Sequence, residues 1–106
     1  MVALKMRVFD LTTERDIQVT IGSEQHMNGI CNVLNRFCHY NKNHNRDIRM
    51  TDFLNHGNNS DLLTAQLVSN VGISNDQAIN VLNRIRDCCI SHYVYVYTNM
   101  FSVDKI

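Results

Sequence analysis

The sequence contains no proline among its 106 residues, so no turn in the chain relies on the fixed φ of that residue. It also lacks any run that approaches the ~18 consecutive apolar residues of a membrane span. No basic-then-apolar signal peptide opens the chain. These absences predict a soluble, cytoplasmic protein that does not engage a membrane.

Sequence motifs of the common catalytic sites are missing as well. There is no glycine-rich phosphate loop, no GxSxG elbow and no HExxH pair. The carboxylates form no close acid–base pair along the sequence, and the five histidines are scattered. The sequence therefore predicts neither an enzyme nor a bound cofactor.

Charge of either sign is not in excess, because ten basic residues cancel ten acidic ones. A balanced chain does not coat nucleic acid by charge alone, but it can carry one locally basic face. Residues 41–49, which are polar and predicted to form a loop, lie in the one locally basic stretch. That stretch holds Arg36, Lys42, Arg46 and Arg49.

Four cysteines raise the question of a metal site or a disulfide. Cys31 and Cys38 fall on the apolar stripe of a predicted helix, and without a secretion signal free thiols are expected. Cys88, Cys89 and His92 form a short run, but zinc sites usually space their ligands as Cys-x-x-Cys units. Core packing is the favoured interpretation, and a metal at this run is the alternative.

Length and composition fit one ordinary globular domain over residues 1–106, with 44% hydrophobic and 19% charged residues. Apolar alternation predicts an N-terminal hairpin from strands 2–9 and 16–21, with its turn at residues 12–15. Ser23 is the predicted N-cap of a helix that runs to about Tyr40, and a short helix is predicted at 51–55.

Two further helices and a second hairpin are predicted after these elements. The first helix is capped by Asn59 or Ser60 and ends at Gly72, in the position where a left-handed residue is wanted. Ser74 and Gln77 form a capping box that opens a helix over 75–86. Strict alternation at 91–97, a turn at Thr98-Asn99 and a return at 100–103 predict a C-terminal hairpin.

The stretch from Leu63 to Ile85 resembles a helix-turn-helix. Leu67, Val68 and Val71 supply the inner face of a first helix, Gly72 supplies the turn, and Ala78 and Val81 pack the second helix onto the first. With a long helix before it and a hairpin after it, the order is similar to that of a winged helix. The resemblance implies an α+β fold: a winged helix-turn-helix with an added N-terminal β-hairpin.

In that family the second helix enters the DNA major groove. The function predicted is therefore sequence-specific binding of double-stranded DNA by a transcription regulator, as a homodimer. Asparagine and glutamine match adenine, and arginine matches guanine or phosphate. The candidate DNA-binding residues are Ser74, Asn75, Gln77, Asn80, Asn83 and Arg84 on this helix, together with Arg46, Arg49 and Asn99.

Winged helices also serve as protein–protein modules, so the alternative is an inhibitor or adaptor that docks on a larger complex. Tyr93, Tyr95 and Tyr97 alternate with Val94 and Val96. If the valines face the core, the tyrosines form an exposed stripe suited to dimerisation or to a protein partner. The other possibility is that this strand is covered on both faces.

Overall fold

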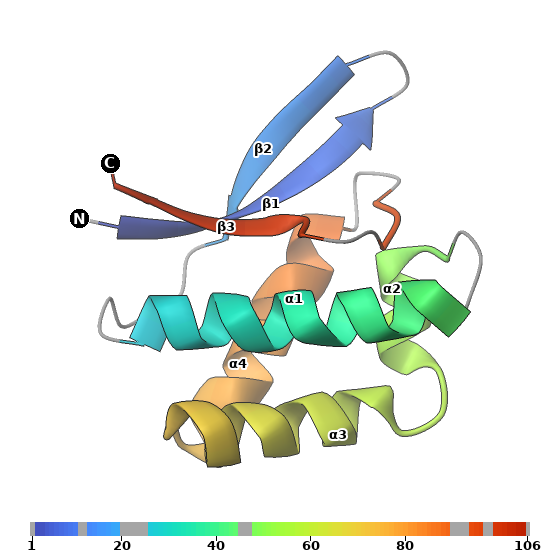
Figure 1. Ribbon diagram of the computed structural model, residues 1–106. Coiled ribbons are helices and arrows are strands. Elements are labelled where there is room, and N and C mark those ends of the chain that lie inside the picture. The colour runs from blue at the N-terminus through green and yellow to red at the C-terminus, as the bar shows by residue number, and fades with distance from the viewer. Residues whose placement is uncertain are drawn as a thin grey trace.

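The computed structural model describes residues 2–10, 13–19, 26–44, 48–89, 94–96 and 99–105, and it has a mixed α+β architecture (Figure 1). Strands β1 (Val2–Asp10) and β2 (Thr13–Val19) pair antiparallel, with Asp10 opposite Thr13. The predicted N-terminal hairpin is thus confirmed. Its predicted turn was placed too late, because residues 13–15 already belong to β2.

The C-terminal hairpin prediction is wrong for the part of the chain that the structure describes. Strand β3 (Phe101–Lys105) pairs antiparallel with β1, so the sheet order is β2-β1-β3. Tyr95 instead forms an isolated bridge with Arg49. Alternation of apolar and polar residues marks a strand but does not specify its partner. Here the long strand β1 pairs along both of its edges.

Helix α1 (Met27–His44) buries the predicted stripe, which comprises Met27, Ile30, Cys31, Leu34, Phe37 and Cys38. The helix continues through residues 41–44, where a loop was predicted from the polar sequence. Adding residues to an existing helix costs far less than starting one, which explains how a polar turn extends α1. The predicted cap Ser23 lies outside the described residues.

Helix α2 (Met50–Asn55) confirms the short predicted helix, and α3 (Asn59–Gln66) follows it. The predicted capping of α3 by Asn59 or Ser60 is wrong, since the N-cap is Asn58 and it makes no side-chain cap hydrogen bond. The Asn59 amide and the Ser60 hydroxyl point back to α2 instead. They donate to the carbonyl oxygens of Phe53 (2.8 Å) and Leu54 (2.5 Å), at the end of that helix.

A π-helical turn, η2 (Leu67–Val71), continues α3, and Gly72 then ends the helix with a φ of 85°. The predicted left-handed glycine is therefore confirmed. Helix α4 (Asn75–Cys89) follows directly and is three residues longer than predicted. The two helices are separate, as a helix-turn-helix requires.

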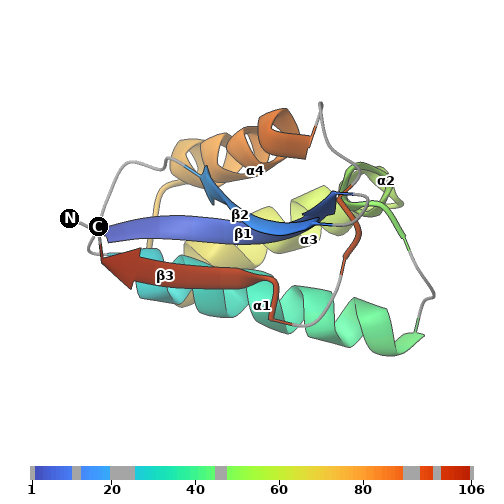
Figure 2. The same ribbon diagram turned by 90° about the horizontal axis from the view of Figure 1, so that it is seen from above.

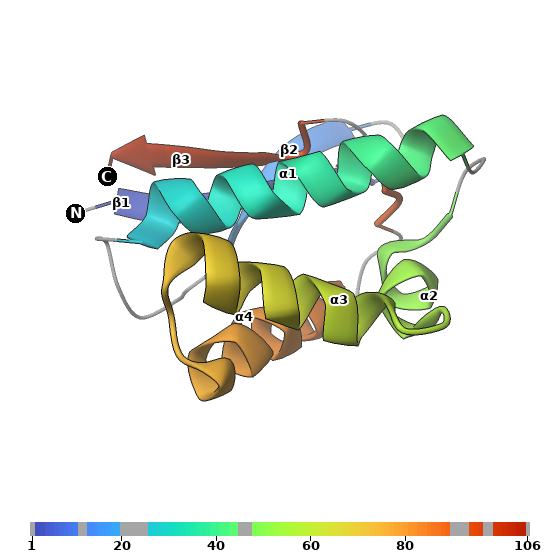
Figure 3. The ribbon, with the colours of Figure 1, turned by 60° about the horizontal axis from the view of Figure 1, so that its bottom comes forward.

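The sheet lies on one side of the helices, as the view from above shows (Figure 2). Helix α1 contacts β1 and β3, α4 contacts β2, and α3 packs against both α1 and α4 on the side away from the sheet (Figure 3). Leu4 and Met6 of β1 are fully buried and join the helical stripes in one core cluster. None of the described helices is long and apolar enough to cross a membrane.

One polar side chain connects α1 to the sheet. The amide nitrogen of Asn35 donates to the carbonyl oxygen of Phe101 (2.9 Å), and the Phe101 N–H donates to the Asn35 amide oxygen (3.0 Å). Both groups of the side chain are thus used on a single residue of β3. This pairing fixes the height at which β3 lies over α1.

Candidate nucleic-acid interface

The start of α4 is fixed by a reciprocal pair of hydrogen bonds. The Gln77 N–H donates to the Ser74 hydroxyl (3.1 Å), and the Ser74 N–H donates to the Gln77 side-chain oxygen (2.9 Å). The predicted capping box is thus confirmed. Two otherwise unpaired backbone donors of the first turn are satisfied, so α4 begins at a defined residue. These bonds use one hydrogen-bond acceptor on Ser74 and one on Gln77, both of which are predicted to contact DNA.

The two faces of α4 separate as the sequence predicts. Its buried residues are Ala78, Val81, Leu82, Ile85 and Cys89. The five predicted DNA-binding residues of this helix, Asn75, Gln77, Asn80, Asn83 and Arg84, are all exposed. With 3.6 residues per turn, burial of the first set turns the second set outward. The structure therefore brings these five side chains to one exposed helix.

Arg86 is a residue that sequence reasoning missed. One guanidinium nitrogen donates to the side-chain oxygen of Asn83 (3.1 Å), and another donates to the Ser60 hydroxyl (2.5 Å). Ser60 in turn donates to Leu54, so α4, α3 and α2 are connected in sequence. The spacing of three residues between Asn83 and Arg86 was the only available signal. These hydrogen bonds hold α4 in one rotation about its axis. They also occupy the side-chain oxygen of Asn83, which Arg86 already uses as an acceptor.

A shallow hollow of about 470 Å³ lies on the exposed side of α4. The described residues that line it are Asp76, Gln77, Ile79, Asn80 and Asn83. Four of the five are polar, and Ile79 is the exception. The hollow therefore presents amide groups and one carboxylate around an aliphatic side chain.

The charges on α4 cancel. Asp76 and Asp87 are exposed, Arg84 is exposed, and Arg86 is half-buried. A face with two carboxylates and two guanidinium groups does not attract phosphate over long range. Any affinity for nucleic acid at this face must therefore come from short-range contacts with the bases.

The remaining predicted site residues do not join this face. Arg49 is exposed and precedes α2, which lies at the opposite end of the molecule from the start of α4 (Figure 1). Asn99 is exposed, has a φ of 60° and lies next to β3. Arg46 lies outside the described residues. The candidate interface is therefore α4 with Ser74.

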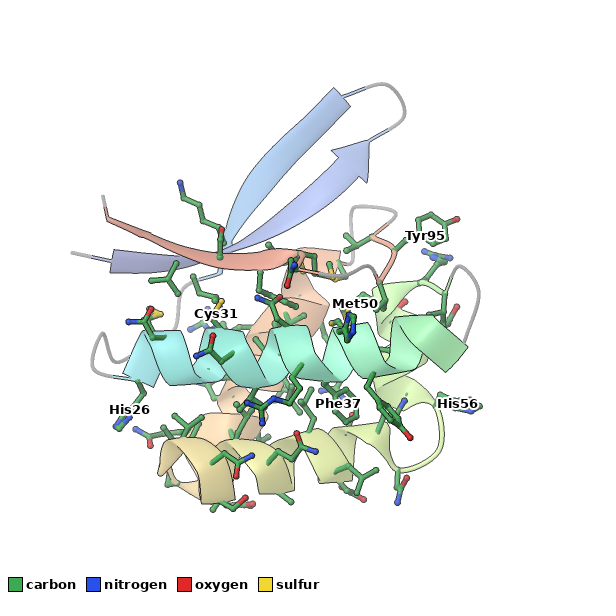
Figure 4. All side chains as sticks on the ribbon, in the orientation of Figure 1. His26, Cys31, Phe37, Met50, His56 and Tyr95 are labelled. Carbon is green, nitrogen blue, oxygen red and sulfur yellow. The ribbon has the colours of Figure 1, made fainter. Side chains whose placement is uncertain are left out.

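Tyr95 is 46% exposed, while Val94 and Val96 are buried. The prediction that the valines face the core is thus confirmed, and Figure 4 shows Tyr95 pointing away from the helices. Tyr93 and Tyr97 lie outside the described residues, so the stripe itself is not described.

A second recess, which the sequence did not indicate, lies between α1 and α3. Its volume is about 280 Å³, and its described lining is Arg36, Phe37, Tyr40, Leu62 and Gln66. Tyr40 is 65% exposed and Leu62 is 46% exposed. Phe37 closes its inner side, because that ring lies beneath α1 (Figure 4) and packs against Phe53 at a centroid distance of 5.5 Å.

The cysteines are free, and three of them are buried, as the core-packing interpretation predicts. Burial raises the pKa of the Cys38 thiol to about 12. Burial, and then the neighbouring Cys88, raise the pKa of Cys89 to about 12 as well. Among the described residues, no three His, Cys, Asp or Glu side chains gather closely enough to hold a metal ion. His92 lies outside those residues.

Comparison with models of protein families, with curated proteins and with solved structures finds no match to this chain.

Proposed function

We propose that this protein binds double-stranded DNA in a sequence-specific manner, as a transcription regulator, and that α4 is the helix that enters the major groove. The observation that carries the proposal is the set of exposed amide side chains on α4, which are Asn75, Gln77, Asn80 and Asn83. At ~1.5 Å per residue, its 15 residues form a helix about 22 Å long. The major groove, about 12 Å wide, admits such a helix.

The supporting scaffold is the unit formed by α3, η2, the turn at Gly72 and α4. The capping box defines where α4 begins, and the hydrogen bond from Arg86 to Ser60 links α4 to α3. A reading helix must be held rigidly, because base contacts depend on register. We further propose that the fold is a variant of the winged helix in which β3 joins the N-terminal hairpin.

The balanced charge of α4 adds an expectation about salt dependence to the proposal. A protein that neutralises many phosphates loses affinity steeply as salt rises. With only Arg84 as an exposed cation on α4, we expect a shallow salt dependence and a binding energy dominated by bases. Arg49 and Asn99 lie off this face, so the proposal depends on α4 alone.

Asn80→Ala tests the proposal. Asn80 is exposed and points away from the buried Ala78 and Val81, so its replacement by a better helix former leaves stability unchanged or slightly higher. Loss of a bidentate base contact weakens binding to the best duplex about 5- to 150-fold and spares scrambled duplexes. The measurement is a titration of labelled duplexes at fixed salt.

Asn32→Ala is the matched control. Asn32 is also exposed and also precedes a buried Val-Leu pair, but it lies on α1. Its replacement leaves binding to every duplex unchanged. Equal affinity of Asn80→Ala and wild type for the best duplex would contradict the assignment of α4 as the reading helix.

A protein-docking module is the second candidate, and the recess between α1 and α3 favours it. Exposed Tyr40 and Leu62 together form an apolar surface of the kind that protein partners cover. Selection of duplexes from a random-sequence pool separates the two functions. Enrichment of one duplex favours DNA reading, whereas the absence of any enriched duplex favours docking.

A further inference from the structure

Ile79 is an exposed aliphatic residue on α4, a helix whose other aliphatic side chains are buried. It is 43% exposed, whereas Ala78, Val81, Leu82 and Ile85 of the same helix are buried. Isoleucine is also a weaker helix former than the polar residues that usually occupy an exposed helix position. Neither core packing nor helix propensity accounts for Ile79 at this position.

The neighbours of Ile79 are the amides of the proposed reading face. Asn75 and Asn83 lie four residues before and after it, so they flank it along the helix. Ile79 also lines the same hollow as Gln77 and Asn80. Any base edge that Asn80 reaches therefore lies near the methyl groups of Ile79.

The carboxylate of Asp76 determines which part of DNA this hollow can accept. It lines the hollow beside Ile79 and is exposed. A carboxylate repels phosphate and the acceptor-rich guanine edge. The hollow is therefore suited to base edges that carry donors or apolar groups.

In the major groove, the apolar group on a base edge is the C5-methyl group of thymine. We propose that Ile79 contacts this methyl group, and that the duplex preferred by the protein carries an A·T pair read jointly by Ile79 and Asn80. The inference rests on the proposed function, since it requires α4 to lie in the major groove. It adds a base identity, which the amides alone do not determine.

Replacement of thymine by deoxyuridine tests this directly, because uracil pairs like thymine but lacks the methyl group. A preferred duplex is first selected from a random-sequence pool with the full chain. Each thymine is then replaced in turn, and affinities are measured at fixed salt. One position is expected to bind about fourfold more weakly as uracil, the change that follows from losing one buried methyl-sized group.

Ile79→Ala identifies the side chain responsible. This variant binds the thymine duplex about fourfold more weakly and no longer distinguishes thymine from uracil at that position. Leu62→Ala is the matched control, since Leu62 is similarly exposed at 46% but lies on α3. It retains the wild-type difference between the two duplexes.

The outcomes separate the inference from the function on which it rests. If no duplex is enriched from the pool, the proposed function fails. If a duplex is enriched and every uracil version binds as tightly, the function stands and the methyl contact is wrong. If Ile79→Ala still distinguishes thymine from uracil, another side chain reads the methyl group and the assignment to Ile79 is overturned.

Discussion

Asn35 places both hydrogen-bonding groups of one side chain against the backbone of a residue 66 positions away. Phe101 is only 3% exposed, so water cannot readily replace the amide. Asn35→Ala leaves a buried N–H and a buried carbonyl without these partners. We expect the free energy of unfolding to fall by about 2–4 kcal/mol, measured by urea denaturation.

Two comparisons separate the hydrogen bonds from the loss of side-chain volume. Asn35→Asp retains an acceptor for the Phe101 N–H but offers no donor to its carbonyl, so it is also destabilised. Asn32→Ala, at an exposed position on the same helix, changes the unfolding free energy by less than about 0.5 kcal/mol. Equal stability of Asn35→Ala and Asn32→Ala would show that the pairing contributes nothing.

Cys38 gives a prediction about alkaline pH. Its pKa is raised by burial to about 12 in the folded chain, from about 9 for an unperturbed thiol. The folded chain therefore holds this proton more tightly than the unfolded chain. The contribution of this proton to the free energy of unfolding is fully present below pH 9 and is lost as the pH rises towards 12.

The measurement is the unfolding free energy between pH 8 and pH 11 in wild type and in Cys38→Ala. Every other titratable group is present in both proteins, so the difference between the two slopes belongs to Cys38. Wild type is expected to lose stability more steeply over this range. Parallel curves would mean that the Cys38 thiolate is solvated without unfolding.

At the scale of elements, α1 packs against η2 at a glycine, Gly29. A Cβ atom built at Gly29 would lie 3.2 Å from the Cγ1 atom of Val71, which is tighter than ordinary contact. Alanine in a helix interior gains about 0.5–1 kcal/mol over glycine when space permits. In Val71→Ala, Gly29→Ala should show that full gain in unfolding free energy. In wild type the gain is smaller or reversed, because Val71 must move.

This pair of measurements forms a double-mutant cycle, and its coupling energy reports the contact between α1 and η2. Additive effects of the two substitutions would show that the helices move apart without cost. They would also show that the π-helical turn is not held against α1.

Elements specified by their own residues are the ones the sequence predicted best. The capping box at Ser74, the left-handed Gly72 and the short helix α2 depend on residues a few positions apart. The pairing of β3 was predicted wrongly because its partner lies about a hundred residues earlier in the chain. Local alternation carries no information about such pairing. The capping role predicted for Asn59 and Ser60 was wrong for a similar reason. Both residues are good N-caps, but here their side chains bond to the preceding helix, α2.

The candidate site also combines features set by the local sequence with features set by the packing of distant elements. The exposed face of α4 followed from its 3.6-residue period, which is a local property. The partner of Arg86 on α3, which is Ser60, and the separation of Arg49 from α4 depend on how the helices pack. Asn32–Arg36 and Asn80–Arg84 repeat one five-residue pattern, and in both the Val-Leu pair is buried. Only the surroundings distinguish Asn35, which bonds to β3, from Asn83, which bonds to Arg86.

For the whole molecule, we expect a homodimer in solution. A single DNA-binding module buries only about 600–1,000 Å² on DNA, which is little for regulatory affinity, and the charges on α4 cancel. Sedimentation at tens of micromolar should give twice the chain mass of 12.3 kDa. Tyr95→Asp should shift this value towards the monomer, because Tyr95 is an exposed aromatic suited to such an interface.

The control is Asn32→Asp, which places the same carboxylate at an exposed position on α1 and leaves the mass unchanged. A monomer at every concentration, with and without DNA, would remove dimerisation from the proposal and leave α4 as a single reading unit.

The pairing of β1 with β3, in which Val2 lies opposite Lys105, has a consequence for the speed of folding. The helices between the two strands are built from local contacts and can form within microseconds, whereas the addition of β3 to β1 must first close almost the entire chain into one loop. Figures 1 and 2 show the start of β1 and the end of β3 side by side at the same end of the sheet. A circular permutant that joins them through a short linker and opens at the turn around Gly57 turns this closure into a simple hairpin. Such a permutant should refold markedly faster than the natural order of the chain.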